Sequence, residues 1–220
     1  MPEIDPAVTR GAMERMWGQG EPVTGAGPVG LYLRSRAIVL DEYPSVLRFL
    51  PRTNAAAQGE TPVWCGAMLA KVVSDGRAVN VHRTFLSLEA STKRKLMRGT
   101  LPAGSAVQLF PIGKTLGIAE GLENALAANM LTGFPVWAAL NAGNLAKWQP
   151  PPGVERVLIF GDNDALGTGQ AAAWAAANRI LLKGIAVDVR IPEREGDDWN
   201  SVLMRRECNL IQPYNGKVGT

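Results

Sequence analysis

The sequence predicts an α/β protein in two parts: a smaller α+β region over residues 1–110 and a mostly parallel sheet flanked by helices over residues 111–210. Two observations predict this. In the second part, short apolar strand-like segments alternate four times with helical segments across short connections, which is typical of parallel sheets. In the first part, the strongest pairing signal is an antiparallel hairpin around an Asp-Gly turn. Residues 211–220 are expected to form a C-terminal tail.

The first part is predicted to be irregular, with antiparallel strands. Its hairpin is the clearest feature, because Asp75-Gly76 suits a tight turn between two apolar runs. The expected elements are, in order, a helix (7–17), a Gly/Pro loop (18–28), a helix (29–36), a strand closed by Pro51 (47–50), a loop (54–61), the hairpin strands (68–73 and 78–86) and a strand (106–110).

The second part changes rhythm. Each apolar run is short enough for a buried strand, and glycines end two of the intervening helices. The expected elements are, in order, a strand ending at Ala119, a helix (124–131), a strand (136–140), a short helix (144–148), a strand (154–160), a long helix (170–182), a strand (185–191) and a last helix (199–206).

Composition narrows the class of protein. The chain has 220 residues, of which 46% are apolar and 20% charged, as expected of a globular protein with a sizeable core. The two cysteines, Cys65 and Cys208, form no CxxC pair, so a zinc ribbon is excluded, a disulfide scaffold is disfavoured and no zinc is expected. The polar N-terminus and the lack of a long apolar run indicate no leader and no membrane contact, hence a cytoplasmic protein.

Charge is distributed unevenly between the two parts. Residues 1–110 carry 13 Lys and Arg against 9 Asp and Glu, a net charge of +4. Residues 111–220 carry 10 against 11, a net charge of −1. A basic half beside an acidic half suits an anionic substrate and a metal site.

Acidic residues follow three of the four predicted parallel strands. Glu120 ends the first, Asp162 and Asp164 end another, and residues 193–198 hold four carboxylates after the last. Because ligands bind beyond the carboxyl ends of parallel strands, these acids should carry the chemistry. Clustered carboxylates repel one another unless a cation neutralises them, and their hard oxygens suit Mg²⁺ or Mn²⁺. The simpler alternative is that strand ends are polar because they are exposed.

Two other classes share parts of this pattern. The run from Gly167 to Ala172 fits a GxGxxA dinucleotide fingerprint, with Asp188 further along. However, Asp162–Leu166 separates the strand from the first glycine, and Asp188 lies within its strand instead of at its end. A haloacid-dehalogenase-like phosphatase also has an Asp-x-Asp after an apolar strand, but it does not require the upstream Glu120-Gly121.

The order of the motifs resembles the Toprim domain, which is shared by bacterial-type DNA primases, topoisomerases and several nucleases. An apolar strand ending in Glu-Gly is followed about 40 residues later by one ending in Asp-x-Asp. The match is closest to Toprim-containing primase-like proteins of phages and plasmids. It covers roughly residues 25–205 and rests on the segments 118–126, 135–140, 161–167 and 198–200, with 32–36 and 81–86 in the first half.

This resemblance implies a Rossmann-like Toprim fold and assigns roles by position. Glu120 corresponds to the general acid/base, and Asp162, Asp164 and Asp198 correspond to Mg²⁺ ligands. Paired metals neutralise charge in phosphodiester chemistry, and a nearby carboxyl moves the proton. Relatives usually carry Asp where this chain has Ser201. Accessory acids are therefore expected at Asp197 and Glu123.

A basic run in the first half is expected to hold a nucleic-acid backbone without reading its sequence. The candidate residues are Arg34, Arg36, Arg83, Lys93, Arg94, Lys95 and Arg98. A solvated surface is an equally good interpretation of such a run. Four aromatic residues suit stacking on bases, although a core role is favoured for them: Trp17, Tyr32, Trp64 and Phe85. His82, the single histidine, is expected to be structural.

Three functions remain open. The leading one is a Toprim-type DNA primase, or a fragment of one, that joins nucleotides on single-stranded DNA in a bacterial cell or phage-infected host. Since primases of this kind generally use a zinc ribbon, the partner would be a replicative helicase or a zinc-ribbon-bearing protein. The alternatives are a metal-dependent nuclease on the same scaffold and a non-catalytic nucleic-acid-binding or replisome-interaction module.

Overall fold

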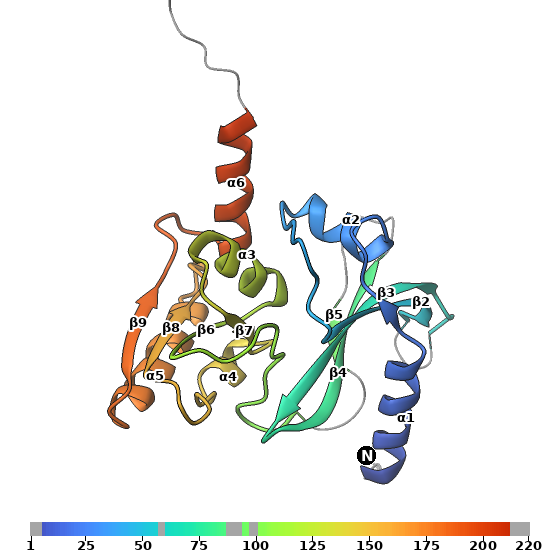
Figure 1. The fold of residues 1–220 in the computed structure, drawn as a ribbon, viewed down its shortest axis with the longest axis horizontal. Helices are drawn as coiled ribbons and strands as arrows, with labels where there is room; N and C mark the ends of the chain where they lie inside the picture. Colours follow the sequence, from blue (N-terminus) through green and yellow to red (C-terminus); the bar gives the residue numbers. More distant parts are fainter. Residues whose placement is uncertain (1–5, 57–59, 87–93, 97–100, 212–220) are drawn as a thin grey trace, which may run out of the picture.

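The computed structural model describes residues 6–56, 60–86, 94–96 and 101–211. A five-stranded antiparallel sheet from the first half stands beside a four-stranded parallel sheet from the second (Figure 1). The strand orders are β1-β2-β3-β4-β5 and β7-β6-β8-β9. The predicted fold class, a parallel α/β sheet preceded by an antiparallel α+β region, is confirmed.

The first half has two helices beside its sheet. Their bounds, with those of the strands, are α1 (Pro6–Gly18), β1 (Glu21–Pro22), α2 (Pro28–Ser35), β2 (Leu47–Asn54), β3 (Trp64–Ser74), β4 (Arg77–Leu86) and β5 (Arg94–Leu96). Two of these strands were not expected: β1 lies within the predicted Gly/Pro loop, and β5 lies in the basic run. Two- and three-residue edge strands leave too little pattern to be recognised from sequence.

The predicted hairpin forms, and its strands are longer than predicted. Asp75 and Gly76 both adopt positive φ, 48° and 72°. Left-handed conformations at both central residues make a turn whose twist matches that of the paired strands. Strand β2 also runs past Pro51, where the sequence predicted its end. Its pairing with β3 shifts between Leu50 and Thr53, so the missing N–H of Pro51 falls in the irregular stretch.

The strand predicted over residues 106–110 is wrong. Ala106 makes an isolated antiparallel bridge with Val73 of β3, and Val107 makes one with Ala138 of the parallel sheet. The segment is apolar because it is buried, but it crosses from one sheet to the other and so cannot run along either. The segment therefore connects the antiparallel sheet to the parallel sheet.

The strands and helices of the second half follow one another in the predicted order, and their ends differ from the predicted ones by a few residues. The elements are β6 (Thr115–Ala119), α3 (Leu122–Thr132), β7 (Val136–Ala138), α4 (Ala142–Leu145), β8 (Arg156–Phe160), α5 (Thr168–Leu181), β9 (Ala186–Arg190) and α6 (Trp199–Ile211). All three strand pairings are parallel.

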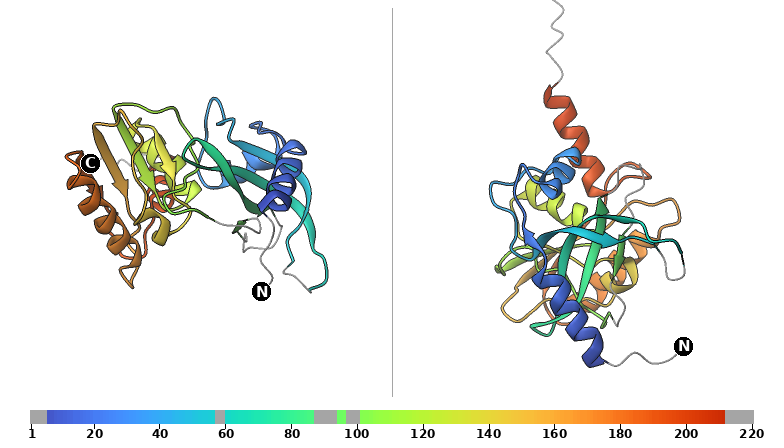
Figure 2. Two further views of the ribbon diagram at one scale, coloured as in Figure 1. Left: turned by 90° about the horizontal axis from the view of Figure 1, so that it is seen from below. Right: turned by 90° about the vertical axis from the view of Figure 1, so that its right-hand side faces the viewer.

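Helices cover both faces of the parallel sheet. Alternate residues of β6 and β8 point to opposite faces, as a strand requires. Ala119 and Phe160 pack with α3 and α6 in one core, whereas Ile118 and Ile159 pack with α5 in the other. Figure 2 shows the two helix layers on either side of the strands. The acids that follow β6 and β8 therefore emerge at one edge, between the layers.

One core runs through both halves of the chain. Leu33 of α2 and Met68 of β3 belong to the same buried cluster as Leu122 and Leu126 of α3. The two halves are therefore packed through an apolar interface and not merely tethered. Of the predicted C-terminal tail, residue 211 ends α6, and residues 212–220 lie outside the described residues. Within the described residues no helix is long and apolar enough to span a bilayer.

The shared core predicts that both halves unfold together. Leu33→Ala should lower the free energy of unfolding by about 3 kcal/mol, because Leu33 is fully buried and its removal leaves a cavity. Leu31→Ala is the matched control, because Leu31 lies on the same helix and is 53% exposed. Circular dichroism and tryptophan fluorescence should report one coincident transition. Two separate transitions, with only one affected by Leu33→Ala, would contradict the shared core.

Candidate functional site

The structure brings four predicted acids to the carboxyl edge of the parallel sheet. Ala119 and Phe160 are register partners, so Glu120 and the Asp-x-Asp loop leave the sheet at the same level. The charge of Asp162 is coupled to those of Glu120, Asp164 and Asp198. The four carboxylates thus share one neighbourhood.

Asp162 is the electrostatic centre of this group. Its burial, followed by repulsion from Glu120, Asp198 and Asp164, raises the pKa of Asp162 to about 7. One contact opposes the shift: Asn124 Nδ2 donates a hydrogen bond of 2.8 Å to Asp162 Oδ1. An aspartate whose pKa lies near neutral pH indicates local negative charge that the fold itself does not compensate.

Glu120 is also perturbed. Burial raises the pKa of Glu120, the nearby charge of Asp164 adds to the rise, and a hydrogen bond from the backbone N–H of Ala142 opposes it. The end of β7 is tied to the same residue, since Leu140 N donates to the Glu120 carbonyl at 2.6 Å. Leu140 has φ of 74°, which is uncommon for a residue with a side chain. The hydrogen bond to Glu120 therefore comes from a residue, Leu140, whose own conformation carries a local cost.

Asp164 differs sharply from Asp162. Its carboxylate accepts hydrogen bonds from the N–H groups of Leu166, Thr168 and Gly169, at 3.1, 3.0 and 2.6 Å. These donors lower the pKa of Asp164, with Gly169 contributing most. Asp164 thus compensates the amino end of α5, whose first N–H groups have no partner within the helix. The two acids of one motif have separate tasks: Asp164 is fixed in its ionised form, and Asp162 carries the unbalanced charge.

Two glycines allow α5 to lie directly against the Asp-x-Asp loop. A Cβ at Gly169 would come within 2.8 Å of the Asp162 carbonyl oxygen, and one at Gly161 within 2.9 Å of Ala173 Cβ in α5. Neither position has room for a side chain without displacing the loop. The same closeness lets the Gly169 N–H reach Asp164.

Asn163, between the two acids, joins their loop to the acidic loop after β9. Its backbone N–H donates to the Asp197 carbonyl at 2.9 Å, and its Nδ2 donates to the Pro192 carbonyl at 2.8 Å. Its own carbonyl accepts from Gly196 N at 2.6 Å. These bonds position the start of α6, and therefore Asp198, beside Asp162.

Ser201 has a structural task that the sequence did not suggest. Asp198 Oδ1 accepts from Ser201 N at 2.7 Å, and Ser201 Oγ lies 3.1 Å from Asp198 N. This reciprocal arrangement is a capping box at the start of α6. Asp197 is buried and paired with Arg205, which lowers the pKa of Asp197. The two adjacent acids are thus distinct: Asp198 remains next to Asp162, whereas Asp197 has its own counter-ion.

A chain of amides and a tyrosine connects this edge to the first half. Asn124 Oδ1 accepts from Asn200 N at 3.2 Å, and Asn200 Nδ2 donates to the Arg36 carbonyl at 2.8 Å. Tyr32 OH donates to Glu123 Oε1 at 2.7 Å. The predicted accessory acid Glu123 therefore holds α2 against α3. Asn124 was given no role from sequence, although its place one turn after Glu120 in the first turn of α3 is a usable signal.

The predicted nucleic-acid residues are spread over two surfaces. Arg34 is exposed on α2, and the Arg36 guanidinium carbon lies 5.9 Å from the Tyr32 ring centre. Arg83 lies on β4, where burial lowers its pKa. Lys93 and Arg98 lie outside the described residues, and Arg94 and Lys95 are described only as backbone in β5.

No group of three or more His, Cys, Asp or Glu residues in the described ranges is arranged so that it could hold a metal ion. Mg²⁺ characteristically uses one or two carboxylates and keeps several waters. The oxygen donors and the uncompensated charge at Asp162 fit such an ion. We therefore treat the edge as a candidate site for a hydrated Mg²⁺ and not as a complete protein cage.

Comparison with known families agrees with this architecture. A family model described as a Toprim domain matches residues 115–207. The second half of the chain is a Toprim domain. A second model, described as a domain of unknown function (DUF7146), matches residues 7–109. No curated protein matches the chain by sequence. The predicted resemblance to the Toprim domain is thus confirmed.

Solved structures extend the likeness beyond the Toprim domain. A DNA primase domain from Pseudomonas aeruginosa is 14% identical, with a TM-score of 0.52 over 91% of this chain and 74% of that one. The Aquifex aeolicus primase, with its zinc-binding and RNA polymerase domains, is 17% identical, with a TM-score of 0.55 over 94% and 61%. A DnaG primase catalytic domain bound to single-stranded DNA is 13% identical, with a TM-score of 0.58 over 90% and 78%. The chain therefore shares the fold of these primase structures, and it spans only part of each of them.

The charge imbalance predicts that removing one acid stabilises the protein. Asp162→Asn should raise the free energy of unfolding by on the order of 2 kcal/mol at pH 8 without divalent metal. Because the pKa of Asp162 is raised in the folded state, its protonated side chain contributes fully to the stability of the wild type below the ordinary pKa of 3.8. That contribution is lost as pH rises through about 7. The gap in melting temperature between variant and wild type should therefore widen from pH 5 to pH 8. A constant gap would argue against the electrostatic explanation.

Asp164→Asn is predicted to act in the opposite direction. The pKa of Asp164 is lowered by its amide donors, so its stabilising contribution is present above the ordinary value and is lost as pH falls. The variant should melt below the wild type at pH 7, and the two should converge in acid. Melting curves of both variants on the same pH series make each the control for the other.

Proposed function

We propose that this Toprim protein is a Mg²⁺-dependent nucleotidyltransferase of the DNA primase type, which joins nucleotides on a single-stranded DNA template. The observation that carries the proposal is Asp162: a half-buried carboxyl with its pKa raised to about 7 beside three other carboxylates. Such an arrangement opposes folding unless a cation is bound, and in a Toprim domain it lies at the ligand-binding edge of the sheet.

The metal-binding role falls to Asp162, with Asp164 and Asp198 beside it. When bound, Mg²⁺ would neutralise charge on the transferring phosphoryl group and on the leaving oxygens. The protein's contribution is to hold the oxygens ready: Asn124 orients Asp162, backbone amides fix Asp164, and the capping box fixes Asp198.

Glu120 is proposed as the general acid/base. Its pKa is raised by burial and by Asp164, so it can hold a proton nearer to neutral pH than an exposed glutamate does. Its backbone is held on both sides, by β6 and by the bond from Leu140. A carboxyl that is both fixed and shifted can take the proton from an attacking primer hydroxyl.

The template is proposed to lie on the basic first half, along the candidate residues on α2, on β4 and in the basic run. The related DnaG catalytic domain is described as bound to single-stranded DNA, which supports the same partner here. A replicative helicase or a zinc-ribbon-bearing protein is proposed to help engage the template. The Aquifex primase, of which this chain spans 61%, is described with a zinc-binding domain. We place this activity in the cytoplasm of a bacterial or phage-infected cell.

Primer synthesis tests the proposal directly. The protein, alone and with a zinc-ribbon primase partner, should incorporate labelled nucleotides on single-stranded DNA only with Mg²⁺ or Mn²⁺. Glu120→Gln and Asp162→Asn should each reduce the rate by about 10³-fold, since each removes a group acting in the transition state. Glu155→Gln is the matched control, because Glu155 is an exposed acid paired with Lys114 at the opposite end of the sheet.

The assay also separates the competing functions. Loss of labelled DNA without added nucleotides, abolished by the same two variants, would identify a nuclease. DNA binding with no turnover in either assay would identify a non-catalytic binding module.

Metal binding can be tested without activity. Added Mg²⁺ should raise the melting temperature of the wild type, because binding to the folded state alone stabilises it. It should raise that of Asp162→Asn much less. An equal rise in both proteins would place the ion elsewhere.

A further inference from the structure

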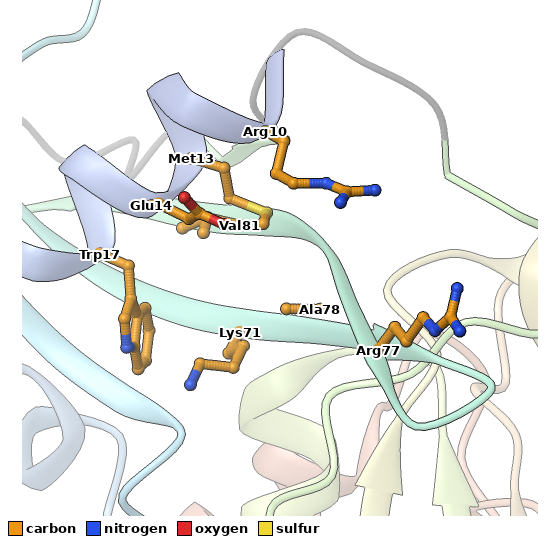
Figure 3. A pocket seen from close by; sticks show the side chains of 8 residues that line it. All are labelled: Arg10, Met13, Glu14, Trp17, Lys71, Arg77, Ala78 and Val81. Atoms are coloured by element: carbon orange, nitrogen blue, oxygen red, sulfur yellow. The ribbon is translucent and has the colours of Figure 1, made fainter. Parts of the chain in front are cut away.

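A pocket of about 410 Å³ lies on the first half, between α1 and the β3–β4 hairpin. It belongs to the face of the antiparallel sheet on which Met13 of α1 packs against Leu50, Leu69 and Val81. The side chains around it come from both elements (Figure 3): Arg10, Met13, Glu14, Trp17, Lys71, Arg77, Ala78 and Val81. None of these residues has a part in the site proposed above.

The pocket is positively charged. Three of its residues are cationic, namely Arg10, Lys71 and Arg77, and only Glu14 is acidic. Among the described residues none of the three cations forms an ion pair or a hydrogen bond through its side chain. Figure 3 shows Arg10 and Arg77 extended at one end of the pocket and the Lys71 amine beside Trp17 at the other. Uncompensated cations around a hollow favour an anionic ligand.

The floor of the pocket is apolar and contains an aromatic ring. Met13 and Val81 are buried, and the Lys71 ammonium lies 4.4 Å from the centre of the Trp17 ring. Arg48 holds the same residue, with its guanidinium carbon 4.6 Å from the ring centre and its Nη1 donating to the Trp17 carbonyl at 2.8 Å. The indole is therefore fixed in place before any ligand arrives, which reduces the entropic cost of binding.

The pocket is remote from the acidic edge. In Figures 1 and 2, α1 lies on the side of the antiparallel sheet that faces away from the parallel sheet. A single nucleotide bound there therefore lies across the antiparallel sheet from the parallel sheet that carries the acidic edge.

We propose that this pocket binds one nucleotide unit, with its phosphate between Arg10 and Arg77 and its base against the apolar floor, beside Lys71 and Trp17. The volume suits a ligand of that size. Cations beside a flat aromatic surface are the combination by which proteins bind single nucleotides without sequence preference. The unit is either a free nucleoside triphosphate or one residue of a single strand. This second binding site goes beyond the proposed activity, because it requires no metal and no catalysis.

Direct binding tests the proposal with the full chain in EDTA, so that the acidic site takes no part. ATP and a short oligo-dT strand are the two probes, each measured against wild type and the double variant Lys71→Gln/Arg77→Gln. Both residues are outside the core, so the variant should fold normally. Arg206→Gln is the control, since it removes an exposed cation from α6. The double variant should weaken binding of one probe by about tenfold and reduce its salt dependence, whereas the control should not.

The probe that responds identifies the source of the nucleotide. A loss confined to oligo-dT assigns the pocket to a strand, and a loss confined to ATP assigns it to free nucleotide. Photocrosslinking of 5-iodouracil-containing oligo-dT should then label the peptide containing Trp17, and Trp17→Ala should remove that label.

Equal binding of both probes to the double variant and to the control would overturn the proposal. So would binding of poly-glutamate, sensitive to the double variant, when neither nucleotide probe binds. The primase proposal is tested separately. If the protein synthesises primers but the double variant binds both probes as well as the wild type does, the primase proposal stands and the pocket proposal fails. If nucleotide binding depends on the pocket but no primer is made, the pocket proposal stands and the primase proposal fails.

Discussion

The candidate site is organised around Asp162, a half-buried carboxyl whose pKa is raised first by burial and then by repulsion from its neighbouring carboxylates. Four carboxylates are brought to one edge by the parallel pairing of β6 with β8 and by the loop that follows β9. The fold supplies these groups with amide donors but gives Asp162 no cationic partner among the described side chains. The apolar packing around the site therefore has to stabilise a local arrangement that is unfavourable by itself, which is common where a protein awaits a charged ligand.

The surrounding contacts control how the repulsion is distributed. Asp164 is neutralised in part by the amino end of α5, Asp198 is fixed by Ser201, and Asp197 is paired with Arg205. Each of these acids is either fixed by hydrogen bonds or neutralised by its own counter-ion. The remaining negative charge is thereby concentrated on Asp162 and Glu120, the two acids at this edge whose pKa values are raised, first by burial and further by neighbouring carboxylates.

Much of this could be predicted from the sequence because strand ends are readable. An apolar run followed by an acid fixes both the strand and the edge at which the acid emerges, so the grouping of Glu120 with Asp162 follows from topology alone. What could not be predicted depends on contacts between distant segments. Asn124 looks like an ordinary helix residue until Asp162 is placed beside it. The segment 106–110 has the apolar content of a strand, and only the positions of both sheets show that it crosses between them.

The crossing segment has a mechanical consequence. Its two single-residue bridges connect it to β3 on one side and to β7 on the other, which joins the halves at one point. The hydrogen bond between Asn200 and the Arg36 carbonyl joins them at a second, separate point. The two halves are therefore joined at two separate points and through a common apolar core, which opposes hinge-like motion between them. A ligand bound by the first half would therefore lie at a distance from the acidic edge that the packing of the two halves determines. The separation between the first half and the acidic edge is thus a fixed property of the fold.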